Sequence, residues 1–387
     1  KFVMADGKGL ADITKVAKGT YVVKAELMGY KTFADMQLET RMAKKPENVY
    51  NLLDQIWKPA VEAAERELDD IRMMMRKDGI KGEPKPWDYM YYLDKAKQEK
   101  FNISEAEVSQ YLEINNVIQG IFWTANKLYG LSFRERTEDY PQYHKQQQSW
   151  DVIDKKGNLI AIFYSDYYPR DGKGAGAWCG RFRPQSYDGA MRVQPIVTNV
   201  CNMTLPTEEG GPALQTVDNV LTMFHEFGHA LHSFFRDVQY EGTGGVERDF
   251  VELPSQINEH WAFEPEVLRQ YARHYQTGEV IPQELVEKID ASSKYGQGFA
   301  TVEYLAASYV DLDLHYLTEM PKKLDVMKFQ AEKMRKRGMP SQILPRYSVT
   351  NFSHTMGGGY SAGYYSYIWA EVLDADAFEA FKETGDI

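Results

Sequence analysis

The chain has 387 residues, of which 43% are hydrophobic and 26% are charged, proportions typical of a globular protein. Its formal net charge of −11 argues against nucleic acid or an anionic membrane surface as the main partner, because both repel an acidic protein. No apolar run approaches the roughly 20 residues needed to span a bilayer, so we expect no membrane segment.

The N-terminal part of the chain, about residues 1–140, is predicted to be helical. Pro59 is expected to kink or break the first of two amphipathic patterns, and Ser104 and Glu107 form a capping-box pair at the start of the second. These patterns predict helices at about 46–79 and 104–130. The chain opens without an initiator Met and stops inside a helical pattern, so we expect a fragment of a longer protein.

Between about residues 145 and 202, short β-branched and aromatic runs separated by Gly, Pro and Asp predict a small sheet. The stretch GKGAGAWCG, which includes Gly176, lacks the GxGxxG order of a dinucleotide loop. We expect a tight turn that feeds an edge strand, where an extended peptide can add to the sheet. Cys179 and Cys201 do not predict a disulfide framework. Further helices are predicted at about 216–236, 255–275, 282–317 and 361–382.

An H-E-x-x-H motif, His225 to His229, lies inside an amphipathic helical pattern. Positions four apart differ by only about 40° around a helix, so both imidazoles point the same way. Two neutral imidazoles on one face form half of a tetrahedral zinc site, and Glu226 is placed to act as a base. The plainer alternative is two ordinary histidines with a glutamate between them.

A catalytic zinc needs a third protein ligand and one open position. An extended motif with a third histidine is excluded, because His232 occupies its glycine position and Phe235 its last histidine position. The remaining source is a downstream acid, and spacing alone does not choose among Glu241, Glu247, Asp249, Glu252 and Glu259.

The stretch HTMGGGYSAGYYSY, residues 354–367, combines three consecutive glycines with four tyrosines. Tyr360, Tyr364 and Tyr367 would share one face of a helix that starts near Ser361. A tyrosine stripe packed in the core is the alternative, but it leaves the glycines unexplained. Glycines suit a loop that moves or that approaches a substrate backbone closely.

Three motifs in this order, FHEFGHALH, ERDFVELPSQINEHWAFEPEVL and GGGYSAGYYSYIW, resemble the thimet oligopeptidase family of zinc metallopeptidases. Within that family they look most like the bacterial peptidyl-dipeptidases. The resemblance implies a mainly α, almost all-helical two-lobed ellipsoid with a deep channel and one small sheet near the active site. The chain would then be a fragment of one catalytic domain, with helices to about 140, the sheet at 145–202, zinc-binding helices at 210–275 and a helical part with the Gly/Tyr loop at 280–387.

The resemblance also implies one zinc ion per chain, held by His225, His229 and Glu252. Glu226 is implied as the general base that takes a proton from the zinc-activated water. Glu259 lies seven residues past Glu252, on the same face if the segment is helical, and is expected to orient a ligand histidine.

By the same resemblance, Tyr360 and Tyr367 stabilise the transition state, and His354 contacts the substrate and the oxyanion region. Tyr364 is expected to contact the substrate, together with Gly358, Gly359 and Gly176. An arginine suits a peptide's terminal carboxylate, but the sequence does not choose among Arg181, Arg183, Arg248 and Arg346.

The expected activity is zinc-dependent hydrolysis of short unstructured peptides with release of C-terminal dipeptides. One alternative is an oligopeptidase that cleaves internal bonds, and a different-class alternative is a non-catalytic helical peptide-binding protein. We expect a monomer without nucleic-acid or membrane partners. A cytoplasmic location is expected, with a periplasmic form left open.

Overall fold

The computed structural model describes residues 28–208, 210–319 and 323–384. Contacts between residues divide the chain into two compact units, each assembled from segments that are distant in sequence. The expectation of a single catalytic domain stays a prediction. Of the described residues, unit 1 takes those up to Lys97, Glu247–Phe250 and Lys294–Trp369, and unit 2 takes Gln98–Val246, Val251–Ser293 and those from Ala370 on.

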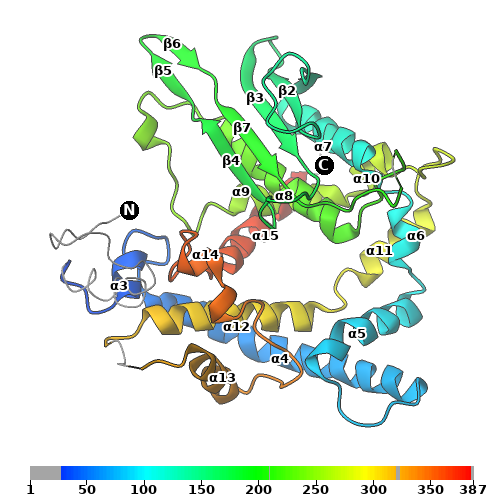
Figure 1. The fold of residues 1–387 in the computed structure, drawn as a ribbon, viewed down its shortest axis with the longest axis vertical. Coiled ribbons are helices and arrows are strands. Elements are labelled where there is room, and N and C mark those ends of the chain that lie inside the picture. Colours follow the sequence, from blue (N-terminus) through cyan, green and yellow to red (C-terminus); the bar gives the residue numbers. More distant parts are fainter. Residues whose placement is uncertain (1–27, 209, 320–322, 385–387) are drawn as a thin grey trace. The chain divides into compact units, whose positions relative to one another are not determined.

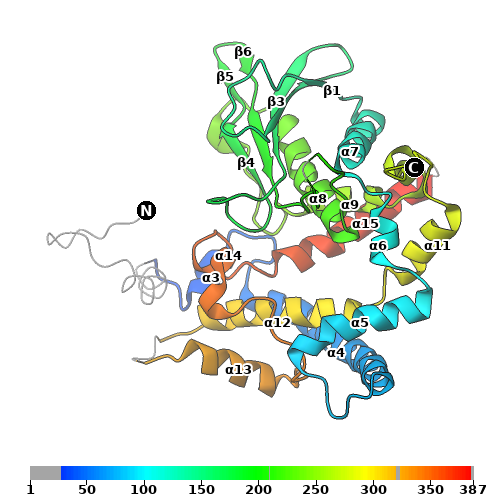
Figure 2. The same cartoon turned by 45° about the vertical axis from the view of Figure 1, so that its right-hand side comes forward.

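Unit 1 is helical, and its longest helix, α4, runs side by side with α12 (Figures 1 and 2). α4 continues as one helix through Pro59, so the helix does not break there, and the expected kink stays a prediction. Burial of Trp57 and Ala60 on either side offsets the roughly 3 kcal/mol that an internal proline costs. The helices are α3 Phe33–Leu38, α4 Pro46–Lys77, most of α5 Pro86–Phe101, α12 Gln297–His315, α13 Val326–Lys336, α14 Ser353–Met356 and the first turn of α15 Ser366–Thr384, with the 3₁₀ turn Val349–Asn351.

The two long helices of unit 1 approach closely at Gly298. A Cβ at this position would lie 2.3 Å from the backbone nitrogen of Ala64, so only glycine fits. The buried carboxylate of Glu67 on α4 accepts hydrogen bonds from the backbone N–H groups of Gly298 (2.8 Å) and Phe299 (2.9 Å). These bonds satisfy donors that the first turn of α12 leaves free.

Unit 2 contains a five-stranded mixed sheet of order β1-β2-β3-β7-β4. β3 and β7 are parallel, and the other pairs are antiparallel. β4 lies at an edge of the sheet, as expected for the strand after the glycine-rich turn. The strands are β1 Ser132–Glu135, β2 Gln148–Ile153, β3 Leu159–Asp166, β4 Trp178–Arg183 and β7 Ile196–Val200, and β5 Ser186–Asp188 pairs with β6 Met191–Val193 in a separate ribbon.

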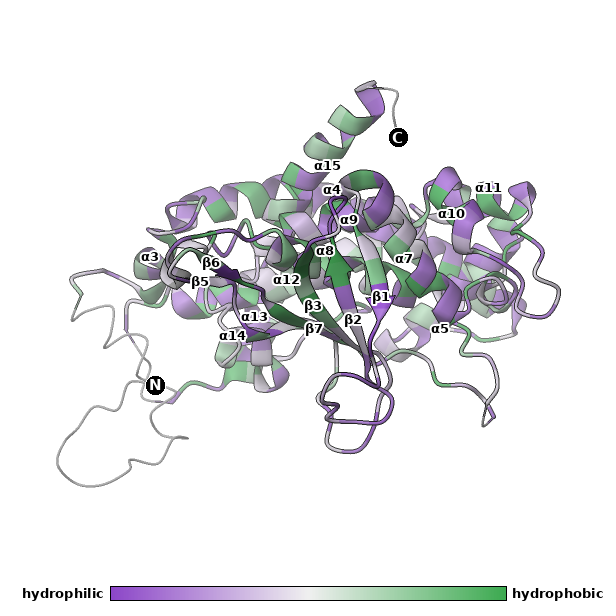
Figure 3. Ribbon diagram, turned by 90° about the horizontal axis from the view of Figure 1, so that it is seen from above, coloured by the Kyte–Doolittle hydropathy of each residue, from purple (hydrophilic) through white to green (hydrophobic). Residues whose placement is uncertain are grey.

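Helices cover this sheet, with α8 against β7 and β3 (Figure 1). Figure 3 shows hydrophobic colouring along α8 and the central strands, where the unit's core includes Phe163, Val197, Phe227 and Phe234. The helices are α6 Glu105–Ser109, α7 Ile114–Tyr129, α8 Val217–Phe234, α9 Leu253–Ala262, α10 Pro265–Tyr271, α11 Gln283–Ser292 and the rest of α15, with the 3₁₀ turn Glu241–Thr243.

In three places where the sequence predicts a single helix, the structure has two shorter helices. The pattern at 104–130 is interrupted because Leu112 and Ile114 bond to the backbone of Gln215 and Ala213. The pattern at 255–275 is interrupted by Pro265, which disfavours helical geometry at the residue before it. The pattern at 282–317 is interrupted at Gly296, whose φ is +92°.

The prediction of a mainly helical protein with one small sheet is confirmed. The channel between two lobes stays a prediction. Among the described residues, no helix is both long and apolar enough to cross a bilayer.

Candidate active site

The H-E-x-x-H motif lies on α8 in unit 2, as the sequence predicts. The side chain of Thr216 accepts a hydrogen bond from the backbone N–H of Asn219 and caps the helix start. The rings of His225 and His229 lie on one face with their centroids 5.0 Å apart. The buried face of α8 packs against the sheet, while both imidazoles remain partly accessible.

Gly228, between the two histidines, allows α9 to cross α8 at close range. A Cβ on Gly228 would lie 2.3 Å from the carbonyl oxygen of Pro254 and 2.7 Å from Cα of Ser255. This approach brings Glu252, the residue that precedes α9, to the two histidines. The glycine in the motif is thus required by the helix crossing.

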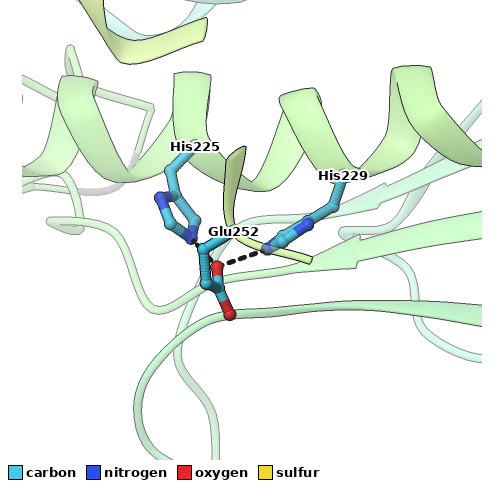
Figure 4. Close-up of side chains that lie close together, drawn as sticks. All are labelled: His225, His229 and Glu252. Atoms are coloured by element: carbon cyan, nitrogen blue, oxygen red, sulfur yellow. Dashed lines mark ion pairs between the residues drawn. The ribbon is translucent and has the colours of Figure 1, made fainter. Parts of the chain in front are cut away.

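Three side-chain donors converge at this crossing (Figure 4). Oε2 of Glu252 lies 3.3 Å from Nε2 of His225 and 3.1 Å from Nε2 of His229, and all three donor atoms lie within 4.8 Å of one another. Ligands placed tetrahedrally at 2.0–2.1 Å from zinc are about 3.3 Å apart. The donor types and their spacing therefore fit one zinc ion with an open fourth position.

The charges of this group are strongly coupled. Burial disfavours ionised Glu252, which is 2% exposed, but hydrogen bonds from both histidines outweigh it and hold its pKa well below the usual range. Burial would lower the pKa of His225, but hydrogen bonds to Glu252 and Glu259 raise it to about 10. A metal ion entering here would replace the proton on His225.

Glu259 lies on α9 and contacts the far side of His225. Its Oε1 is 2.5 Å from Nδ1 of the imidazole, as expected if the segment after Glu252 is helical. With Nδ1 engaged, Nε2 of the same ring is left facing Glu252.

Glu226 is buried in the same helix, with 6% of its surface exposed. Within the described part of the chain, its Oε2 has no hydrogen-bond partner. Burial raises the pKa of this carboxyl, although the neighbouring histidines oppose the shift. A buried carboxylate oxygen with an unused lone pair is suited to hold and deprotonate a water molecule.

The predicted tyrosines lie together in unit 1. The rings of Tyr360 and Tyr367 are stacked with centroids 5.5 Å apart, and those of Tyr364 and Tyr367 are 5.4 Å apart. The imidazole of His354, on α14, is 5.6 Å from Tyr364 and 6.2 Å from Tyr360. The structure therefore brings these four rings into one cluster.

The helix expected at 361–382 begins only at Ser366, so the three tyrosines do not share a helix face. The buried carboxylate of Asp311 on α12 explains this difference. It accepts the backbone N–H groups of Ala362 (3.0 Å), Gly363 (2.9 Å) and Tyr364 (3.0 Å). Ala362 has a φ of +53°, which a helix does not permit.

The glycines predicted to contact substrate lie in both units. Gly176 is in the turn before β4, where Nδ2 of Asn202 donates to the carbonyl oxygens of Gly174 and Gly176 at 2.8 Å each. In unit 1, Gly359 has a φ of +91°, a conformation that favours glycine, whereas Gly358 N–H bonds to Ser353 O at 2.7 Å.

The four candidate arginines are also divided between the units. Arg181 and Arg183 lie on β4, and Arg183 donates to the carbonyl oxygen of Gln194. Arg346 lies near Tyr364 and Glu303, and Arg248 lies over the ring of Tyr360. The structure does not single out one of them as a carboxylate-binding residue.

The sequence did not reveal the roles of Asp311 and Tyr365. Asp249, one of the candidate zinc ligands, bonds instead to the hydroxyl of Tyr365. No local signal marks these roles, because the tyrosine-turn N–H groups bonded to Asp311 and the carboxylate bonded to Tyr365 lie more than 50 positions away in the chain.

The chain combines an H-E-x-x-H pair on a helix with a converging glutamate, in a mainly helical fold. These features place it in the class of metallopeptidases. The sequence profile described as peptidase family M3 matches residues 9–387, and the chain belongs to this family. This membership confirms the resemblance inferred from the three motifs.

Among curated relatives, the chain is 40% identical over 368 residues to dipeptidyl carboxypeptidase from Escherichia coli (strain K12), covering 94% of this chain and 54% of the relative. It is 36% identical over 370 residues to oligopeptidase A from the same organism, covering 93% and 53%. The chain thus spans about half the length of the curated relatives it matches. A Bacillus anthracis (strain Ames) crystal structure provisionally named oligoendopeptidase F shares the fold, with a TM-score of 0.51 at 14% identity over 96% of this chain and 52% of that chain.

Proposed function

We propose that the protein is a zinc-dependent peptidase that hydrolyses short peptides. The observation that carries this proposal is the convergence of His225, His229 and Glu252, whose donor atoms lie within 4.8 Å of one another. The set contains three ligands and no cysteine, which is typical of a catalytic zinc rather than a structural one. The family membership supports the same activity.

The protein's own groups then have distinct tasks. The zinc ion supplies Lewis acidity that activates water and polarises the scissile carbonyl. Glu226 accepts a proton from the attacking water on Oε2, which has no bond partner among the described residues, and passes it to the leaving amine. The raised pKa of Glu226 makes it a stronger base than a solvated carboxylate.

Tyrosine hydroxyls are the proposed donors to the negative charge that develops on the carbonyl oxygen. Tyr360 and Tyr367 are stacked, and Tyr367 stands in the first turn of α15. An oriented donor of this kind is worth about 3–4 kcal/mol in acyl-transfer enzymes. His354 and Tyr364 would contact the peptide beside them.

The proposed reaction releases dipeptides from free C-termini, as the name of the relative with 40% identity describes for that protein. Cleavage of internal bonds is the second candidate, because oligopeptidase A is nearly as similar. The proposed substrates are short unstructured peptides, bound by a monomer.

Zinc-loaded full-length protein, incubated with an unstructured peptide and with its C-terminally amidated form, tests the reaction. Mass spectrometry should show dipeptides released from the free form, and little cleavage of the amidated form. Equal cleavage of both forms would establish the internal-cleavage alternative instead.

Glu226→Gln tests the catalytic role. This variant should keep zinc but lose turnover by orders of magnitude, whereas Asp218→Asn, an exposed acid on the same helix, should behave as the wild type. A zinc-loaded wild type that binds peptides without cleaving them would support the non-catalytic alternative.

A further inference from the structure

The four-residue segment Glu247–Phe250 packs with unit 1, although the chain on both sides of it belongs to unit 2. Glu252 follows only two residues later, and two residues span at most about 7 Å. The position at which unit 1 holds this segment therefore limits where the carboxylate of the proposed third zinc ligand can lie.

Asp249 anchors the segment. Its side chain is fully buried, and its carboxylate accepts hydrogen bonds from the backbone N–H groups of Met42 (2.9 Å) and Ala43 (3.0 Å). The hydroxyl of Tyr365 donates a third bond at 2.7 Å. Bonds to an ionised acceptor are about twice as strong as neutral ones. The three bonds to the Asp249 carboxylate therefore hold the segment against Met42, Ala43 and Tyr365.

The preceding residue holds the other end of the tyrosine stretch. The guanidinium of Arg248 lies 4.8 Å from the ring centroid of Tyr360, within the range of a cation–π interaction. A Cβ on Gly359 would lie 3.2 Å from Nη2 of Arg248. Arg248 and Asp249 therefore contact Tyr360 and Tyr365, respectively. These two tyrosines flank the turn at residues 362–364, whose N–H groups bond to Asp311.

We propose that Asp249 is a positioning residue for Glu252, which follows it three residues later in the chain. Tyr365, through its hydroxyl, is the partner that completes this link. The inference rests on the proposed function for what the positioned groups do. Catalysis needs donors and ligands held to within about 0.5 Å, and one buried carboxylate close in sequence to a ligand can provide this.

Tyr365→Phe, compared with Tyr309→Phe, tests the link in the full-length protein. Tyr309 is a matched control, because it is also fully buried in unit 1 and its hydroxyl donates to Asp54 at 2.6 Å. Both variants lose one hydroxyl–carboxylate bond, buried at Asp249 and part-buried at the exposed Asp54, so both should lower the melting temperature. Zinc loss to excess dipicolinate and the steady-state constants are then measured for each.

Tyr365→Phe should accelerate zinc loss and lower kcat by about tenfold or more, with a smaller change in KM, as positioning residues around metal ligands do. Tyr309→Phe should change neither quantity by more than about twofold. Asp249→Asn, which has a single acceptor oxygen, should show the same pattern more strongly. If Asp249→Asn does not fold, the comparison of Tyr365→Phe with Tyr309→Phe is sufficient to test the proposal.

Equal zinc-loss rates in Tyr365→Phe and Tyr309→Phe would overturn the proposal, because Asp249 would then stabilise the fold without positioning the site. If the wild type binds zinc but cleaves no peptide, the proposed function fails. The comparison of zinc-loss rates still judges the positioning role in that case.

Discussion

Oε1 of Glu259 lies 2.5 Å from Nδ1 of His225, so the ring nitrogen that faces Glu252 is fixed by a bond on the opposite side of the imidazole. A carboxylate in this position sets the tautomer and raises the basicity of a ligand histidine. The contact gives Glu259 a proposed role in zinc affinity, although its carboxylate lies outside the three converging donors.

Glu259→Gln should therefore weaken zinc binding by about 10–100-fold, measured by competition with a chelator of known affinity. Glu266→Gln is the control, because this residue is exposed in the first turn of α10. If the two variants bind zinc equally well, the contact with His225 does not tune the site.

The parts of the site that the sequence predicted depend on local periodicity. His225 and His229 share a face because of their spacing on one helix, and neither position needs a distant partner. Glu252 was reached only through the family resemblance, because its approach depends on the crossing of α9 at Gly228. Spacing along the chain carries no information about such a crossing.

The tyrosine stretch shows the opposite outcome. A spacing of four and three predicted a helix face for Tyr360, Tyr364 and Tyr367, but Asp311 takes the backbone donors that a helix would use. The competing acceptor lies more than 50 residues upstream. Local propensity was overridden by a tertiary hydrogen bond, which a single sequence does not reveal.

Asp311→Asn should lower the free energy of unfolding by about 2–4 kcal/mol, because a buried acceptor of several hydrogen bonds is lost. It should also lower kcat by about tenfold to a hundredfold, since small displacements of catalytic groups are costly. Denaturant unfolding and steady-state kinetics measure the two effects.

Asp313→Asn provides the matched control for this substitution. Asp313 is also buried on α12, but its carboxylate bonds to Tyr50 and Arg337 instead of the tyrosine turn. It should lose stability while kcat stays within about threefold of the wild type. A similar loss of kcat in both variants would show that Asp311 acts only through stability.

Tyr367→Phe should reduce kcat by about 100–1,000-fold with little change in KM, because the hydroxyl is proposed to bond mainly in the transition state. Steady-state kinetics on a fluorogenic peptide measures both constants, and Tyr309→Phe serves as the buried-tyrosine control. An effect confined to KM would make Tyr367 a substrate contact instead of an oxyanion donor.

Glu371, on α15 in unit 2, should make stability depend on pH. Glu371 is exposed at the surface, but partial desolvation of its carboxyl, with Asp374 and Glu259 nearby, raises its pKa from 4.5 to about 7. Between these values the folded protein binds more protons at this site than the unfolded chain, so its stability falls as the pH rises through this window.

Glu371→Gln removes this titration. The melting temperature of Glu371→Gln, relative to that of the wild type, should therefore be higher at pH 8 than at pH 5. Thermal unfolding of the metal-free protein at both pH values measures this difference. Glu379→Gln, an exposed substitution on the same helix, should give a curve parallel to that of the wild type. A parallel curve for Glu371→Gln as well would mean that desolvation and the neighbouring carboxylates do not hold a proton on this carboxyl.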